Sequence, residues 1–379
     1  VGLGVAVRRW RQPPYAFALI WLFVGIAPSL LIGPEAATTR SIVALPAIYV
    51  FPALAFEAVS SRLARRFQFS VTLGPWLIFV GLVAATGVTT FRDYFLRWGE
   101  SPDVRAAYQH TLIEEMKYID SRFDGGIAVL SSINPSAPHD PYIAELALRR
   151  KNVRLRWADG REAMIFPDDT NVRWIIPAST PLDPFFDSLL ARNAERVDLR
   201  PGDLDPYFAV TPRTTNNQAR ILARAASANQ RIIEPTSLPV NFADAVEFVG
   251  YEWQYPSVRP GDTLRLMTIW RVTDPERVGP RVPPAFKTDA VLFVHLLDGQ
   301  GGVIAQQDRL DAPSWDWVKG DVIAQIFRLA LPADLPPGEY SAETGIYNRS
   351  DGARLPVLDS SGATVSDRAV LAPLRVATP

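Results

Sequence analysis

The sequence contains no cysteine among its 379 residues. This excludes a disulfide framework, a thiolate metal site and a cysteine nucleophile. Only three histidines are present, and His110, His139 and His295 lie too far apart to indicate a zinc motif, so we expect no metal site. The 39 basic and 40 acidic side chains nearly cancel. A nucleic-acid partner is therefore not expected, because such proteins present a basic surface.

The charges are distributed unevenly along the chain. Residues 1–91 hold seven arginines and only two acidic residues, Glu35 and Glu57, which gives a net charge of +5. The other 288 residues hold 32 basic and 38 acidic residues, which gives −6. This shift in composition is the strongest boundary in the sequence and predicts a change of environment near residue 91.

The first part contains three long apolar stretches, at about 15–33, 41–59 and 67–91. A helix needs ~20 apolar residues to cross a bilayer, and only helices satisfy their own backbone groups in lipid without neighbours. We therefore predict three transmembrane helices in a multi-pass membrane protein. A transporter is disfavoured, because the only acidic residue inside a stretch is Glu57, close to the end of its helix.

The arginines predict the orientation of these helices. One cluster at 8–11 precedes the first helix, and a second at 62–66 fills the connection between the second and third. The positive-inside rule places both clusters in the cytoplasm. Everything after residue 91 is then expected to be extracytoplasmic.

The rest of the chain divides into three predicted regions. Residues 92–200 are predicted to form an amphipathic helix, at 101–123, and a small α/β region with a mixed sheet. Within it, Asp159–Gly160 predicts a hairpin between strands at 153–157 and 162–166. No GxGxxG motif follows the first strand, so no dinucleotide site is predicted and the cofactor remains unknown. Residues 201–240 are predicted to be a linker, with a helix as the alternative at 216–228.

Residues 241–379 predict an antiparallel β-sandwich. Eight alternating or apolar segments are separated by Gly- and Pro-containing turns, as is typical of such folds. These segments lie at 246–253, 263–272, 290–298, 302–308, 322–331, 339–347, 354–358 and 369–376. The predicted fold is thus three transmembrane helices, a small α/β region and a C-terminal sandwich.

Two tryptophans of the predicted sandwich are candidates for glycan stacking. Trp315 and Trp317 flank Asp316 in a loop, where exposed rings could pack against a sugar. The alternative is that both belong to the core, as aromatic residues in sandwiches commonly do. His295 lies in the middle of a predicted strand, which favours a structural role.

Several segments resemble bacterial GT-C membrane glycosyltransferases, similar to the protein O-mannosyltransferases and the lipid A aminoarabinose transferases. The run RSIVALPAIYVFPAL at 40–54 and the run FRDYFLRW at 91–98 look like the last membrane helices of these enzymes. Long members end in a β domain, which the segments VRPGDTLRL, LFVHLLD and LPADLPPGEY resemble.

The resemblance implies transfer of a sugar from a polyprenyl-phosphate donor to a glycan, lipid or protein acceptor on the extracytoplasmic side. It implies that Arg40, ahead of the second helix, holds the donor phosphate, although a simple interfacial anchor explains this residue equally well. The acidic outer loop that carries catalysis in the family has no counterpart here. We therefore expect the catalytic residues to lie upstream of Val1, in a longer protein. The alternative is a non-catalytic, membrane-anchored surface protein whose sandwich binds a glycan or a partner.

Overall fold

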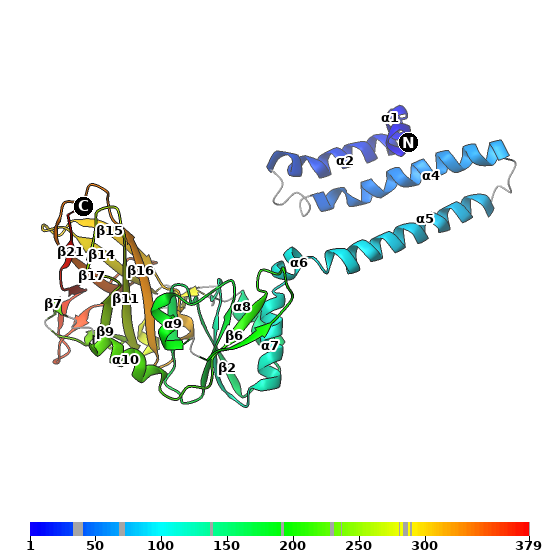
Figure 1. Ribbon diagram of the computed structural model, residues 1–379. Coiled ribbons are helices and arrows are strands. Elements are labelled where there is room, and N and C mark those ends of the chain that lie inside the picture. Colours follow the sequence, from blue (N-terminus) through cyan, green and yellow to red (C-terminus); the bar gives the residue numbers. More distant parts are fainter. Residues whose placement is uncertain are drawn as a thin grey trace. The chain divides into compact units, whose positions relative to one another are not determined.

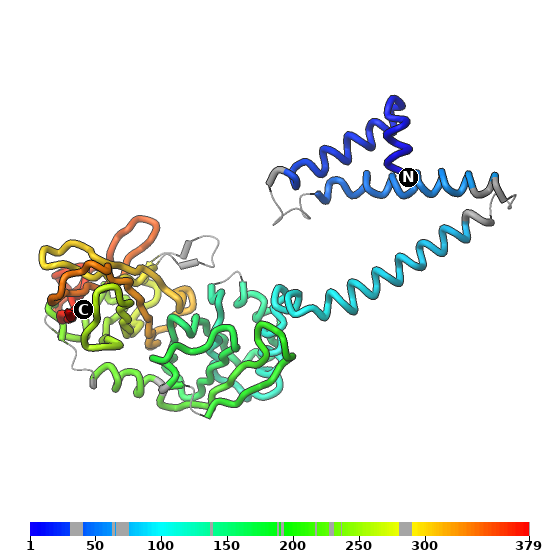
Figure 2. The backbone as a smooth tube through the Cα atoms, turned by 45° about the horizontal axis from the view of Figure 1, so that its top comes forward, coloured from blue at the N-terminus to red at the C-terminus, as the bar shows by residue number. Residues whose placement is uncertain are grey.

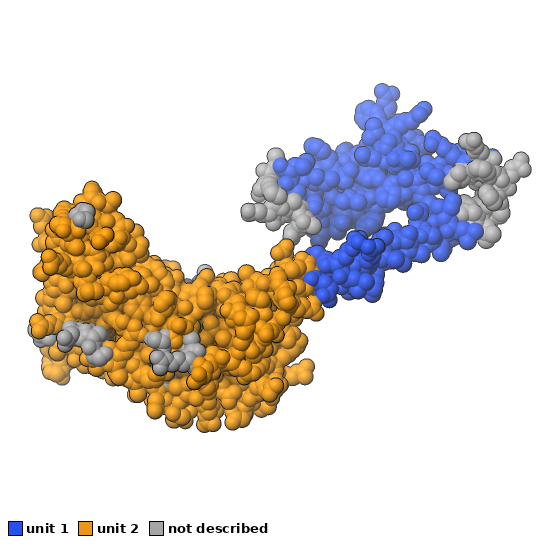
Figure 3. Space-filling model, viewed as in Figure 1, with its two compact units in different colours: residues 1–100 blue, residues 101–379 orange. Residues whose placement is uncertain are grey.

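The computed structural model describes residues 1–32, 41–67, 73–136, 139–190, 193–227, 231–235, 237–279, 281–282, 287–288 and 290–378. These residues form two compact units, Val1–Glu100 and Ser101–Pro379, each of which has its own packing (Figure 3). The boundary falls nine residues after the change in charge that the sequence shows. We refer to them as the membrane unit and the globular unit.

The described residues of the membrane unit are mainly helical. Its elements are α1 (Gly2–Arg8), α2 (Pro13–Ile32), η2 (Ser41–Ala44), α4 (Leu45–Phe67), α5 (Leu73–Phe91) and the π-helical η3 (Arg92–Trp98) (Figure 1). Three stretches are long and apolar enough to cross a membrane: Pro13–Leu30, Ser41–Arg62 and Trp76–Trp98. The three predicted spans are thereby confirmed as candidates, and the third extends beyond its predicted end at residue 91.

Small residues allow the helices of the membrane unit to approach one another closely. A Cβ atom on Gly25 of α2 would lie 2.8 Å from the Cα atom of Ala44, and one on Gly2 would clash with the carbonyl group of Phe51 in α4. Close approach at small residues is how helices associate in lipid, where the hydrophobic effect does not drive them together. A larger side chain at either glycine would separate these helices.

The globular unit begins with an α/β layer. The α-helices of the globular unit are α6 (Pro102–Ala107), α7 (His110–Arg122), α8 (Asp140–Ala147), α9 (Pro184–Leu190) and α10 (Asn217–Ser227). The strands of the α/β layer are β1 (Gly126–Ser131), β2 (Val153–Ala158), β4 (Val172–Pro177), β5 (Glu195–Asp198) and β6 (Tyr207–Val210). These strands form one sheet in the order β2-β1-β4-β6-β5, in which β1 runs parallel to β2 and β4 while β6 runs antiparallel to β4 and β5. The sheet is mixed, as predicted.

The predicted amphipathic helix at 101–123 is two helices in the structure. Gln109 between α6 and α7 adopts a left-handed conformation, with φ of 57°, which interrupts the helix. Only α7 presents an apolar face to the core, through Leu112, Met116, Ile119 and the following Phe123. The spacing of these residues was correctly interpreted, but the change in backbone direction at Gln109 leaves no pattern in the sequence.

The rest of the globular unit is a β-sandwich, as predicted. One seven-stranded sheet has the order β19-β18-β8-β9-β11-β16-β3, and the other has the path β10-β21-β17-β14-β15 with β20 and β7 attached. Their strands are β3 (Ala163–Phe166), β7 (Ile232–Glu234), β8 (Val240–Phe242), β9 (Val246–Trp253), β10 (Ser257–Val258), β11 (Thr263–Val272), β14 (Ala290–Leu297), β15 (Val303–Arg309), β16 (Val322–Ala330), β17 (Gly338–Asn348), β18 (Val357–Leu358), β19 (Thr364–Ser366), β20 (Ala369–Leu371) and β21 (Leu374–Val376). A two-stranded ribbon pairs β12 (Arg281–Val282) with β13 (Lys287–Thr288).

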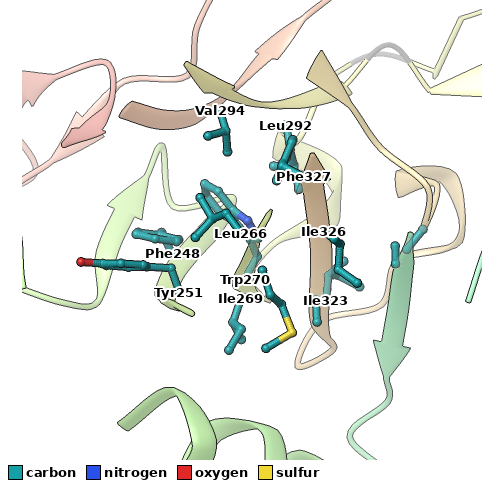
Figure 4. Close-up of a cluster of buried hydrophobic side chains, with 14 of the residues drawn as sticks. Phe248, Tyr251, Leu266, Ile269, Trp270, Leu292, Val294, Ile323, Ile326 and Phe327 are labelled. Atoms are coloured by element: carbon teal, nitrogen blue, oxygen red, sulfur yellow. The ribbon is translucent and has the colours of Figure 1, made fainter. Parts of the chain in front are cut away.

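The core of the sandwich lies between its two sheets. Leu266 and Trp270 of β11 face Leu292 and Val294 of β14, and Phe327 of β16 packs beside them (Figure 4). All five side chains are buried. Alternate residues of β11 point to opposite faces, as a strand requires, and the second face is buried as well, against α9 and α10.

The predicted hairpin at Asp159–Gly160 is wrong. Strand β2 pairs with β1 in the α/β sheet, whereas β3 crosses into the sandwich and pairs with β16. The backbone N–H of Asp159 donates to the carbonyl oxygen of Asp311, and the Asp159 carboxylate accepts from Arg161, so the turn is fixed by the sandwich. One strand of the α/β region thereby joins it to the sandwich in a single unit.

The predicted linker at 201–240 is also wrong. This stretch contributes β6 to the α/β sheet, β8 to the sandwich, and α10, which packs on β9 and can be followed in Figure 2. Arg224 of α10 forms a bidentate ion pair with Glu252 of β9, with nitrogen–oxygen distances of 2.5 and 2.7 Å. The alternative of a helix at about 216–228 is confirmed by α10, whose buried side chains Ile221 and Ala225 lie one turn apart.

Candidate functional site: a groove beside the parallel strands

The two predicted glycan-stacking residues have different environments. Trp317 is only 5% exposed, and its indole Nε1 donates to the carbonyl oxygen of Ala312 at 2.8 Å. A ring buried in this way cannot stack on a sugar, so the predicted exposed pair is corrected to a single ring. Trp315 is partly exposed and lines a groove. Arg40, the predicted phosphate-binding residue, lies outside the described residues and stays a prediction.

A buried arginine fixes the loop that carries Trp315. Arg156 of β2 is 4% exposed, and its Nε donates to Asp316 Oδ2 at 3.0 Å. Its Nη2 donates to Asp321 Oδ2 at 2.5 Å, and the backbone N–H of Trp157 donates to Asp316 at 2.9 Å. Burial alone would lower the pKa of Arg156, but Asp316 and Asp321 hold it above its ordinary value. The acidic residue between the two tryptophans therefore points inward and leaves Trp315 at the surface.

The groove beside Trp315 runs along the edge strand β2 and helix α8. It has a volume of about 460 Å³. Its floor is apolar, from Leu148, Val153 and Leu155, and Tyr142 and Trp315 provide aromatic rings. Charged groups of both signs complete the lining, from Glu145, Arg150 and Lys151. Apolar walls with a few polar groups are typical of small-molecule sites.

A second, smaller opening lies at the carboxyl ends of β1 and β4, and we call it the acidic crevice. Its volume is about 80 Å³, and its lining includes Glu115 of α7, Asp140 of α8 and Asp205 of the loop before β6. Trp157 lines both the crevice and the groove, so the two are neighbours. In the sheet, β2 and β4 lie on opposite sides of β1, so the order of the strands reverses at this point. Ligands bind at such a switch point in many open α/β sheets.

The acidic crevice contains one carboxyl group in an unusual state. Glu115 is 2% exposed, and burial, followed by the negative charges of Asp205 and Asp140, raises its pKa well above the ordinary value. Its Oε1 has no hydrogen-bond partner among the described residues. The sequence contained a sign of this residue, because Glu115 falls three residues after Leu112 and four before Ile119, on the buried face of the helix.

The other acidic residues of the crevice have partners. Asp140 accepts from the Ser132 hydroxyl at 2.5 Å and lies 2.9 Å from Nδ1 of His139. Asp205 accepts from the backbone N–H of Ser179 at 2.6 Å. Both carboxylates therefore have hydrogen-bond partners, unlike Glu115 Oε1.

A further titratable cluster lies on the outer face of the sandwich sheet that contains β14. His295 Nε2 is 3.0 Å from Asp308 Oδ1, and its Nδ1 is 3.1 Å from Glu343 Oε1. Burial lowers the pKa of His295, but hydrogen bonds and charge from Asp308 and Glu343 outweigh it and raise the pKa to about 9. Arg354 donates to the same Glu343 oxygen at 3.1 Å. His295 therefore has the structural role expected from its place in a strand.

No family model and no curated protein matches the chain. The similar solved structures include the C-terminal domain of Wzt, with a TM-score of 0.23 and 13% identity over 37% of this chain and 77% of that one. A family 123 glycoside hydrolase from Clostridium perfringens has a TM-score of 0.16 and 11% identity, over 32% of this chain and 22% of the hydrolase. AvmM, which catalyses macrocyclization in alchivemycin A biosynthesis, has a TM-score of 0.19 and 13% identity, over 35% of this chain and 89% of AvmM. Likenesses this distant assign no function to the chain.

Proposed function

We propose that this chain is the C-terminal portion of an integral membrane glycosyltransferase. In this proposal the enzyme transfers a sugar from a polyprenyl-phosphate donor on the extracytoplasmic side, and the groove beside Trp315 binds the acceptor glycan. The three apolar spans anchor the globular unit at the membrane, where a lipid-linked donor is found.

The observation that carries the proposal is the composition of the groove. A sugar ring has apolar C–H faces and a rim of hydroxyl groups. Trp315 and Tyr142 supply flat apolar surfaces, while Glu145 and Lys151 supply a hydrogen-bond acceptor and a donor. The ion pairs of Arg156 hold the loop of Trp315 in place before a ligand arrives, which reduces the entropy that binding would cost.

The proposal predicts that Trp315→Ala weakens glycan binding at least tenfold, equivalent to ~1.4 kcal/mol. The measurement is the retention of glycan from the producing cell's envelope on the immobilised full chain in detergent. Tyr255→Ala is the matched control, because this aromatic side chain is also exposed but lies outside the groove. Equal retention by the Trp315 variant and the parent would contradict the assignment of the groove.

The alternative, a non-catalytic surface protein that binds glycan, requires a separate test. The full-length protein in membranes would be supplied with radiolabelled polyprenyl-phosphate sugar and the envelope glycan. Label transfer into the glycan supports the enzyme, and we expect Arg40→Ala to reduce it without affecting membrane insertion. Retention of glycan without any label transfer would favour the surface protein.

A further inference from the structure

The lining of the acidic crevice combines acidic side chains with buried polar atoms that lack a hydrogen-bond partner among the described residues. Its lining includes three acidic side chains, Glu115, Asp140 and Asp205, and contains no lysine or arginine. Glu115 Oε1 and the hydroxyl oxygen of Thr180 are both buried and have no hydrogen-bond partner among the described residues. Unsatisfied buried polar atoms are rare in proteins, and each calls for an explanation such as a bound ligand, ion or water.

The basic groups around the crevice are already engaged. The nearest arginine along the chain, Arg105, donates from its Nε to both carboxylate oxygens of Asp203, at 3.0 Å each. His139 bonds to Asp140 on the outer side, and His110 lies 4.0 Å from Glu114. The charges that face Glu115 are therefore chiefly those of Asp205 and Asp140, with His110 from its own helix at the rim.

We infer that the acidic crevice binds a primary ammonium group of a small ligand, with Glu115, Asp205 and the Thr180 hydroxyl as its acceptors. An ammonium group has three donors and no acceptor, which suits a site with unpaired oxygens. A phosphate or carboxylate ligand would be repelled by the acidic side chains. A volume of about 80 Å³ suits an ammonium group and its carbon better than a whole sugar ring. No set of three described His, Asp or Glu side chains is arranged to hold a metal ion.

Binding of an ammonium group has a consequence for the proton of Glu115. Burial, followed by the negative charges of Asp205 and Asp140, raises the pKa of Glu115 well above its ordinary value and so favours the protonated carboxyl group. A positive charge within ~4 Å favours the ionised form, so Glu115 releases its proton to solvent as the ligand binds. Ammonium binding is thus coupled to proton release from Glu115, whereas binding of a neutral sugar is not.

The inference goes beyond the proposed function and does not rest on it, because the groove and the crevice are separate openings. The test is isothermal titration calorimetry of the full chain in detergent at pH 6, in two buffers of different ionisation enthalpy. The probes are glucosamine, 1,5-diaminopentane, glucose and inorganic phosphate. We expect glucosamine to bind at least tenfold more tightly than glucose, with release of a proton, and phosphate not to bind. If diaminopentane binds as tightly as glucosamine, the ammonium site is supported and its ligand need not be a sugar.

Variants separate the role of the acidic groups from an effect on folding. Glu115→Gln keeps the shape of the neutral side chain, and we expect it to abolish proton release and to weaken amine binding at least tenfold. Glu114→Gln is the matched control on the same helix, since Glu114 pairs with Lys117 and does not line the crevice. Asp205→Asn, which can still accept from Ser179, is expected to weaken binding about fivefold. Glucose binding as tightly as glucosamine, no amine binding, or the same proton release with Glu115→Gln would each overturn the inference.

Discussion

Replacing Arg156 by alanine is expected to destabilise the globular unit by about 3–5 kcal/mol. The substitution leaves Asp316 and Asp321 buried without the guanidinium group that both now contact. An uncompensated buried carboxylate is far more costly than the loss of an exposed ion pair. Urea denaturation of the full chain in detergent, followed by tryptophan fluorescence, measures the change in the free energy of unfolding.

The matched control for this prediction lies two residues away on the same strand. Arg154 has a side chain that is 63% exposed and pairs with Asp169 at 3.4 Å. Its replacement by alanine should cost less than about 1 kcal/mol, since exposed pairs contribute little. If the two substitutions lowered the free energy of unfolding equally, burial of Arg156 would have no part in stabilising the loop. The Arg156 variant should also lose glycan retention, because its loop positions Trp315.

Replacing His295 by glutamine is expected to cost about 2–3 kcal/mol at pH 6, because it removes charged hydrogen bonds to Asp308 and Glu343. The effect should depend on pH. An unfolded histidine has a pKa of about 6.5, whereas that of folded His295 is raised to about 9. Its stabilisation is therefore fully present below about pH 6.5 and is lost as the pH rises through about 9.

This prediction is checked by thermal unfolding of the parent and the His295→Gln variant between pH 6 and pH 10. The difference in the midpoint temperature should be largest at pH 6 and should shrink steadily toward pH 10. His139→Gln is the control, because the side chain of His139 is 54% exposed and lies outside the sandwich. A constant difference between the parent and the His295 variant over the whole range would show that the charge of His295 does not contribute.

Features that depend on local pattern could be predicted from the sequence. Apolar length alone indicated the three membrane spans. The alternation of apolar side chains predicted strands at 246–253 and 263–272, and β9 and β11 have these bounds in the structure. In both cases the burial of each residue follows from its own segment, so the pattern and the structure agree.

Features that depend on distant partners could not be predicted. Asp159–Gly160 has the residues of a hairpin turn, but the strand after it, β3, pairs with β16, which lies more than 150 residues later in the sequence. Trp315 and Trp317 are equivalent in the sequence, but in the structure Trp315 is partly exposed and Trp317 is buried, on either side of the Asp316 that contacts Arg156. Likewise, the acidic crevice joins α7, α8 and the loop before β6, whose proximity the sequence does not encode in any short motif.

We propose that the chain crosses the membrane three times and that its globular unit lies outside the cytoplasm. The absence of cysteine allows a direct measurement, because any thiol introduced is the only one within residues 1–379. Exposed Gln12, beside the first arginine cluster, and exposed Ser360, in the globular unit, would each be replaced by cysteine. In intact cells, a membrane-impermeant maleimide should label the variant at 360 at once and the variant at 12 only after permeabilisation. Labelling of position 12 with protection of position 360 would contradict the account.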